Sequence, residues 1–155
     1  MHDEGDRSTP MTPLPRPADV LPHRAPFLFV TELTAVEPGV SAEGTWELAE
    51  DEAFFAGHFP GRPTLPGVLM VESIAQLGGI AVLLDPRYAG KLPLFGGIER
   101  ARFRRQVVPG ETLELRVTMD RLSARAGKGH GRASVGGQTA CEADLLFVIV
   151  DGGAN

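Results

Sequence analysis

The residues of this chain best suited to chemistry are one histidine and one glutamate that lie close together in the sequence. His58 stands in a segment rich in glycine and proline, since residues 57–66 read GHFPGRPTLP. Glu72 follows in an apolar run, where it is the only charged residue between Gly67 and Leu84. A lone carboxyl group among apolar residues is costly to bury and therefore needs a partner or a chemical role. An imidazole held nearby makes general acid–base catalysis in an apolar pocket the favoured interpretation.

Each of these groups has a chemical role and a purely structural alternative. In an apolar setting Glu72 favours its neutral form, which can donate a proton near neutral pH; the alternative is a buried salt bridge with an arginine. The prolines and glycines around His58 hold it in a defined place, although a histidine can also be simply hydrogen-bonded in a loop. Gly67 is expected at a helix N-terminus, where free backbone N–H groups would stabilise an enolate. The structural alternative for Gly67 is an ordinary helix start.

The elements that must position these groups can be predicted from periodicity. Residues 67–84 predict a helix that is apolar on nearly all faces and therefore buried, with Gly78 and Gly79 allowing another element to approach closely. Short helical turns are expected at 18–21 and 50–55. Strands are expected at 27–36, 40–48, 92–103, 112–122, 132–135 and 140–150, with turns at 109–110, 126–131 and 136–137. This order predicts an α+β fold in which one antiparallel sheet wraps around a central helix.

The bulk properties narrow the class of protein. A chain of 155 residues suits a single domain, expected at 18–151 after a flexible, proline-rich tail at 1–17. The net charge of -5 argues against a nucleic-acid binder. The single cysteine, Cys141, excludes an intrachain disulfide and favours a reducing compartment. We find no signal peptide, and Glu72 interrupts the longest apolar run, so we expect a soluble cytoplasmic protein without a membrane span.

Other kinds of site find little support in the sequence. His58 and Glu72 lack a third ligand at a usual spacing, so no metal site is expected. The motifs of serine hydrolases, phosphate-binding loops and dinucleotide sites are absent from the sequence. Of the other histidines, His23 is expected to be structural, and His130 is expected to be exposed in a glycine-rich turn.

A local basic run lies at residues 100–105. On a strand, Arg100, Arg102 and Arg104 would share one face, and Arg105 follows them. Such a run is either a solvated face or a docking surface for an acidic partner, with attraction that weakens in salt.

Four segments of the sequence resemble one known family, in order and with compatible spacing. They are 21–30 (LPHRAPFLFV), 57–76 (GHFPGRPTLPGVLMVESIAQ), 95–110 (FGGIERARFRRQVVPG) and 140–148 (ACEADLLFV). Together they resemble the 3-hydroxyacyl-[acyl-carrier-protein] dehydratases of the FabZ type over residues 18–150. The central segment, 57–76, is far more specific than a lone histidine and glutamate.

The resemblance implies a fold, an assembly and a reaction. The fold would be the hotdog fold, in a homodimer whose sheets join or in a trimer of dimers. The reaction would remove water from a (3R)-3-hydroxyacyl thioester to give a trans-2-enoyl thioester, without a metal or redox cofactor. His58 would take the C2 proton, and Glu72 of the neighbouring subunit would protonate the C3 hydroxyl. The amide of Gly67 would polarise the thioester carbonyl.

The resemblance also implies contacts with the substrate and its carrier. The substrate would arrive on the phosphopantetheine arm of an acidic acyl carrier protein, which makes Arg100, Arg102, Arg104 and Arg105 a candidate docking surface. The residues expected to contact the acyl chain are Phe59, Pro66, Val68, Gln76, Leu94 and Phe95.

Several positions depart from the family pattern. Ala25 stands where a tyrosine is common, Thr31 where an aspartate is common, Leu94 where a tyrosine often gates the acyl tunnel, and Gln106 where a proline is usual. The helix reads ESIAQ instead of EAMAQ. These changes leave the chemistry intact but leave open the acyl chain length and a fatty acid, polyketide or specialised lipid pathway.

Three other functions remain open within the same fold. A related dehydratase/isomerase type has aspartate at the helix position, so Glu72 favours dehydration alone. A thioesterase would activate water for attack on the acyl group, and the His-Phe-Pro element is not its usual mark. A non-catalytic acyl or carrier-protein binding module would have no need to bury Glu72.

Overall fold

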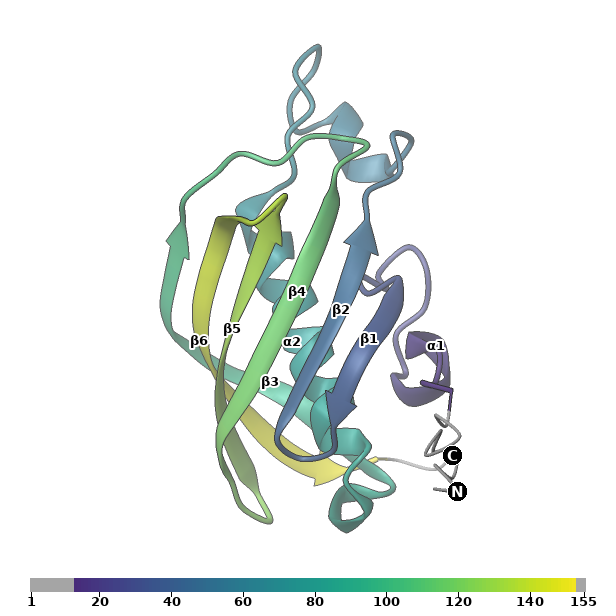
Figure 1. Ribbon diagram of the computed structural model, residues 1–155, viewed down its shortest axis with the longest axis vertical. Helices are drawn as coiled ribbons and strands as arrows, with labels where there is room; N and C mark the ends of the chain where they lie inside the picture. The colour runs from purple at the N-terminus through teal and green to yellow at the C-terminus, as the bar shows by residue number, and fades with distance from the viewer. Residues whose placement is uncertain (1–12, 153–155) are drawn as a thin grey trace, which may run out of the picture.

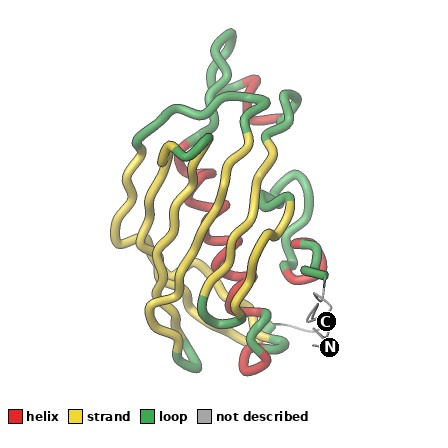
Figure 2. Tube along the Cα trace, in the orientation of Figure 1, coloured by secondary structure: helices red, strands yellow, loops and turns green. Residues whose placement is uncertain are grey.

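The computed structural model describes residues 13–152, which form a six-stranded antiparallel sheet that curves around one long helix (Figure 1). The helix, α2 (Gly67–Leu83), lies against one face of the sheet and packs on strands β2 to β6 (Figure 2). The predicted architecture is confirmed. The strands, in the spatial order β1-β2-β4-β5-β6-β3, are β1 (Glu32–Glu37), β2 (Ser41–Glu47), β4 (Thr112–Leu122), β5 (Ala126–Val135), β6 (Gln138–Asp151) and β3 (Lys91–Phe103). Three short helices complete the fold: α1 (Pro17–Val20), η1 (Ala53–Ala56) and η2 (Pro86–Tyr88).

The core lies between α2 and the inner face of the sheet. Ile74, Leu77 and Ile80 of the helix are fully buried, as an all-round apolar sequence predicts. Strand β4 alternates between buried and exposed residues, and its buried residues include Leu113 and Val117. This packing holds the helix that carries Glu72 rigidly against the sheet.

The prediction of a turn at residues 126–131 is wrong, because this segment is the first half of β5. Gly127, Gly129 and Gly131 alternate along the strand and are all buried on its inner face. A Cβ atom at Gly131 would collide with the side chain of Ile74 from α2. These glycines therefore mark close packing rather than a turn. His130 lies between them on the outer face, and its predicted exposure is confirmed.

The first strand is shorter than predicted, since β1 begins at Glu32 and not at Phe27. Thr31 N donates to Thr45 O of β2, but at Phe27 and Phe29 the backbone is hydrogen-bonded by a side chain of the helix instead of by a neighbouring strand. The Gln76 side-chain oxygen accepts from Phe29 N (2.7 Å), and its Nε2 donates to Phe27 O (3.1 Å). Phe29 and Val30 are buried. The apolar residues of this segment therefore indicate burial in the core and not a strand.

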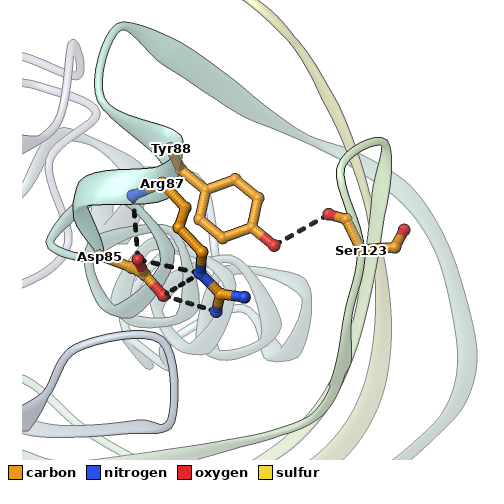
Figure 3. Close-up of polar contacts among 4 residues, drawn as sticks. All are labelled: Asp85, Arg87, Tyr88 and Ser123. Atoms are coloured by element: carbon orange, nitrogen blue, oxygen red, sulfur yellow. Dashed lines mark hydrogen bonds and ion pairs between the residues drawn. The ribbon is translucent and has the colours of Figure 1, made fainter.

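The end of α2 is held by a cluster of polar contacts (Figure 3). Asp85 accepts hydrogen bonds from the backbone N–H and the guanidinium of Arg87, and that guanidinium holds the pKa of the Asp85 carboxyl below its ordinary value. The Tyr88 hydroxyl donates to the carbonyl of Ser123 at 2.9 Å, which ties this end of the helix to the connection between β4 and β5. The predicted helix end at Asp85 is confirmed within one residue or two.

Residues 1–12 of the predicted tail lie outside the described residues, so that part of the prediction stays a prediction. None of the helices within residues 13–152 has the length and apolar character needed to cross a membrane.

Candidate active site

His58 is held in one orientation by the loop between η1 and α2. Its Nδ1 lies 2.7 Å from the carbonyl oxygen of Thr64, and the Thr64 amide donates back to the His58 carbonyl at 2.8 Å. A carbonyl oxygen only accepts hydrogen bonds, so Nδ1 carries the hydrogen and Nε2 carries the lone pair. The half-buried ring therefore presents Nε2 as a base.

The loop that carries His58 is itself fastened to the connection between β3 and β4. Gln106 Nε2 donates to the Thr64 hydroxyl at 2.7 Å, and Leu65 N donates to Val107 O at 2.8 Å. Thr64 and Leu65 are buried. The orientation of His58 thus depends on a loop whose last residues, Thr64 and Leu65, are held in place by hydrogen bonds.

Glu72 lies in the second turn of α2 and faces a cleft of about 340 Å³. Its side chain is 19% exposed, and Oε1 accepts a hydrogen bond from Gln76 Nε2 at 3.2 Å. Within residues 13–152, no arginine comes within ion-pair distance of this carboxyl group, so the alternative of a buried Glu72–arginine salt bridge is wrong there. The rest of the cleft is mainly apolar and includes Leu83, Leu92, Pro93 and Phe147. A carboxyl group at the mouth of an apolar cleft is suited to proton transfer on a lipid-like substrate.

His58 and Glu72 do not meet within one chain. His58 does not line the Glu72 cleft, and within the described residues it makes no ion pair with Glu72. The predicted acyl contacts divide in the same way. Three of them, Gln76, Leu94 and Phe95, line the cleft. Phe59 neighbours His58 with its ring stacked at 4.1 Å, and Pro66 and Val68 flank the start of α2. Within one chain, the His58 region and the Glu72 cleft are therefore separate, and their joining in one site stays a prediction.

Gly67 is the first residue of α2, as predicted. No side chain caps the first turn, and Leu69 N donates to Pro66 O, whereas the amide of Gly67 has no partner within residues 13–152 and is available to an acceptor. A Cβ atom at this position would lie 2.7 Å from Phe103 Cε1 of β3, which explains why glycine stands here. The predicted role of its N–H toward a carbonyl oxygen stays a prediction.

His23 lies at the same cleft as Glu72. It was expected to be structural, yet it lines the cleft, and its Nε2 lies 3.8 Å from Glu72 Oε1. In the sequence, His23 stands in the segment LPHR, at the border of an apolar stretch. That position indicates a histidine near the core, but it does not predict that the histidine lies close to Glu72.

The structure divides the basic run at residues 100–105. Arg100 and Arg102 lie on the outer face of β3, opposite Asp144 and Glu142 of β6, and line an outer hollow. Arg104 pairs with Glu142 at 3.0 Å. Arg105 pairs with Glu111 at 2.9 Å, and this bond raises the pKa of the arginine. Arg100 and Arg102 are therefore better placed than Arg104 and Arg105 to meet a partner.

Comparisons with known proteins identify the family of this chain. The family model of the FabA-like domain matches residues 21–144. The chain is 51% identical to "3-hydroxyacyl-[acyl-carrier-protein] dehydratase FabZ" of Chloroflexus aggregans, over 85% of this chain and 92% of that protein. The protein of the same name from Herpetosiphon aurantiacus is 48% identical over 85% of this chain and 94% of its own length.

Solved structures support the fold. The dehydratase heterocomplex ApeI:P from Xenorhabdus doucetiae matches with a TM-score of 0.75 at 18% identity, covering 88% of this chain and 91% of that chain. A mutant thioesterase, PA1618 from Pseudomonas aeruginosa, matches with a TM-score of 0.62 at 17% identity, covering 79% of this chain and 81% of its own. At such identities these matches show the fold alone. With most of its length matched by the family model and by relatives near 50% identity, the chain belongs to the FabA-like dehydratase family, beside the FabZ-type enzymes.

Proposed function

We propose that this protein removes water from (3R)-3-hydroxyacyl thioesters borne on an acyl carrier protein, giving trans-2-enoyl thioesters for fatty acid or polyketide-type synthesis. The observation that carries the proposal is an imidazole with a fixed Nδ1–H in the loop before α2, and a carboxyl group on α2 that lines an apolar cleft. Relatives named 3-hydroxyacyl-[acyl-carrier-protein] dehydratase, matched over more than nine-tenths of their length, support it.

The proposed reaction uses three groups of the chain. His58 Nε2 takes the proton from C2, while the Gly67 N–H stabilises the negative charge that develops on the thioester oxygen. The electron pair from the C2–H bond forms the C2–C3 double bond as the C3–O bond breaks. Glu72 gives its proton to the departing hydroxyl, which leaves as water. His58 ends protonated and Glu72 ends ionised, so one proton must pass back before the next turnover.

Strand β3 can explain how the two half-sites of the proposed reaction, the His58 and Gly67 region and the Glu72 cleft, come together. It lies at an edge of the sheet, and four of its apolar side chains are 40–54% exposed: Leu94, Phe95, Ile98 and Phe103. A long apolar edge strand is a template for pairing with a second chain. Leu94 and Phe95 line the Glu72 cleft, whereas Phe103 packs beside Gly67. The nine residue steps between Leu94 and Phe103 span about 30 Å.

Antiparallel pairing of β3 with its copy joins the half-sites. About a two-fold axis near Ile98, the Leu94 end of one strand lies beside the Phe103 end of the other. The Glu72 cleft of one chain would then lie beside the Gly67 and His58 region of its partner. We propose a homodimer, alone or within a trimer of dimers, with two composite sites.

Mixed dimers test the composite site. We expect His58→Ala and Glu72→Gln each to fold and to lose most dehydration, because each removes one member of both sites. After unfolding and refolding together in equal amounts, half of the dimers are mixed, and each mixed dimer has one intact and one doubly altered site. The mixture should recover about one quarter of wild-type turnover.

The control is the same mixture without refolding, which should stay inactive as long as subunits do not exchange. If the co-refolded mixture, with mixed dimers verified by native mass spectrometry, is no more active than the separate variants, His58 and Glu72 of one site do not come from different chains.

The reaction itself is tested with a short (3R)-3-hydroxyacyl carrier-protein thioester and mass spectrometry of the product. Loss of one water without release of the acyl group supports the dehydratase. Release of the free acid would indicate a thioesterase, and binding without turnover at any chain length would indicate a binding module.

Carrier docking is proposed for the arginines on the outer face of β3. The double variant Arg100→Gln/Arg102→Gln should raise KM for a carrier-borne substrate about 3–10-fold and reduce its dependence on salt, because exposed charges steer encounter. KM for the same acyl group on free pantetheine should not change, since no carrier protein is present. Arg121→Gln/Arg125→Gln, at two exposed arginines outside β3, is the matched charge control. Equal effects of the two double variants would contradict a specific docking surface.

A further inference from the structure

His23 has an anomaly that packing does not explain. Its Nδ1 is buried and has no hydrogen-bond partner, and it is the one such side-chain atom found among residues 13–152. A buried polar atom without a partner costs stability, so it calls for a physical explanation. The other face of the ring supplies one, because Nε2 points toward the carboxyl group of Glu72.

The position of the ring is well defined. Arg24 donates to the carbonyl oxygens of Leu21 and His23 at 2.9 and 2.7 Å, which shapes this segment of backbone. The ring stacks against Phe27, with centroids 6.5 Å apart. His23 is therefore held at the edge of the cleft with 29% of its side chain exposed.

Nδ1 lacks a partner whether or not it carries a hydrogen, so the contact at Nε2 decides the tautomer. Nε2 faces a carboxyl oxygen of Glu72, and it can use that acceptor only when it carries the hydrogen. His23 is then a donor aimed at Glu72, and not a second base.

Both donors near Glu72 are directed at the same oxygen. Gln76 Nε2 donates to Oε1 at 3.2 Å, and His23 Nε2 faces the same oxygen at 3.8 Å, beyond direct hydrogen-bond distance in the free protein. Hydrogen bonds of an active site often tighten only when substrate is bound. With Gln76 donating to it and His23 facing it, Oε1 serves as the acceptor of the carboxyl group. Oε2 is left to hold the acidic hydrogen.

We propose that His23 is a positioning residue that acts through Glu72: it fixes Oε1 with its Nε2–H, so that the proton delivered to the leaving hydroxyl comes from Oε2. This inference rests on the dehydration proposed above. It assigns a role to a side chain that contacts neither the reacting carbon atoms nor the thioester.

The test compares His23→Leu with His23→Gln in the full-length protein, using the carrier-borne hydroxyacyl substrate. His23→Leu removes the donor, and we expect kcat to fall about tenfold with KM within twofold of wild type. His23→Gln keeps an N–H near the position of Nε2, and we expect most of kcat to return. His130→Leu, the same substitution at an exposed histidine outside the cleft, is the matched control and should leave kcat within twofold of wild type.

Thermal unfolding supplies a readout that separates positioning from folding. Because His23→Leu removes an unsatisfied buried nitrogen, its melting temperature should equal or exceed that of the wild type. A fall in kcat together with a melting temperature that does not fall supports positioning.

Three results would overturn the inference while wild-type dehydration stands. They are an unchanged kcat in His23→Leu, an equal loss in His23→Leu and His23→Gln, and a loss of kcat that only tracks a lower melting temperature. Failure of the wild type to dehydrate any chain length would instead overturn the proposed function.

Discussion

Replacement of His58 by alanine should lower kcat/KM for dehydration about 10²–10⁴-fold, the usual range for a general base. The structure gives the reason, because the hydrogen bond from Nδ1 to the Thr64 carbonyl leaves Nε2 as a fixed proton acceptor. The fold should survive, since His58 is only half-buried and lies in a loop outside the core. Steady-state kinetics and thermal unfolding of the purified variant measure both quantities.

The matched control for His58→Ala is His130→Ala. His130 lies on the outer face of β5, is more than half exposed, and pairs with Asp120 at 3.4 Å. Its loss should leave turnover within twofold of wild type. Near-normal dehydration by His58→Ala would remove His58 from the mechanism, and an equal loss in both variants would point to a general effect of histidine removal.

Substitution of two adjacent helix glycines by alanine should change stability in opposite directions. A Cβ atom at Gly78 would lie 2.8 Å from Phe147 Cζ and 3.5 Å from Val117 Cγ2. Phe147 is buried on the inner face of the sheet and has little room to move. Overpacking of this kind costs about 1–3 kcal/mol, more than the helix propensity of alanine returns. Gly78→Ala should therefore lower the free energy of unfolding by about 1–2 kcal/mol.

Gly79→Ala is both the matched control and the opposite prediction. A Cβ atom there would meet Leu21 and Pro93 at 3.5 and 3.6 Å, which are ordinary contacts. Alanine reduces the entropy of the unfolded chain and favours the helix, so the variant should gain about 0.5–1 kcal/mol. Chemical denaturation of the two variants measures the difference. Similar shifts of the same sign would show that the sheet adjusts freely to a side chain at residue 78.

The elements whose apolar residues recur with a clear period could be predicted from the sequence. The helix was expected at 67–84 and is observed at Gly67–Leu83, and the strand expected at 112–122 is observed at those residues. Both segments carry an apolar pattern matched to their own element, so local information was sufficient. The prediction of a single sheet around a central helix followed from the order of these elements.

The errors arose where a distant residue overrode the local signal. Gly127, Gly129 and Gly131 suggest a turn by composition, but they are strand residues whose inner face is filled by neighbouring side chains. The segment after Phe27 suggests a strand by composition, but the Gln76 side chain takes the backbone hydrogen bonds that a strand would supply. Neither Ile74 nor Gln76 is near these segments in the sequence.

The sequence by itself identified the candidate chemical groups, a histidine in a loop and a lone glutamate in an apolar run, because residue types are visible without any coordinates. Only the tertiary structure decided which groups surround them. It separated His58 from the cleft that Glu72 lines, placed Gln76 and His23 near one oxygen of Glu72, and left β3 as an apolar edge strand of the sheet. The physical reason is that residue type and periodicity are local properties, whereas a site depends on distances between segments that only packing brings together.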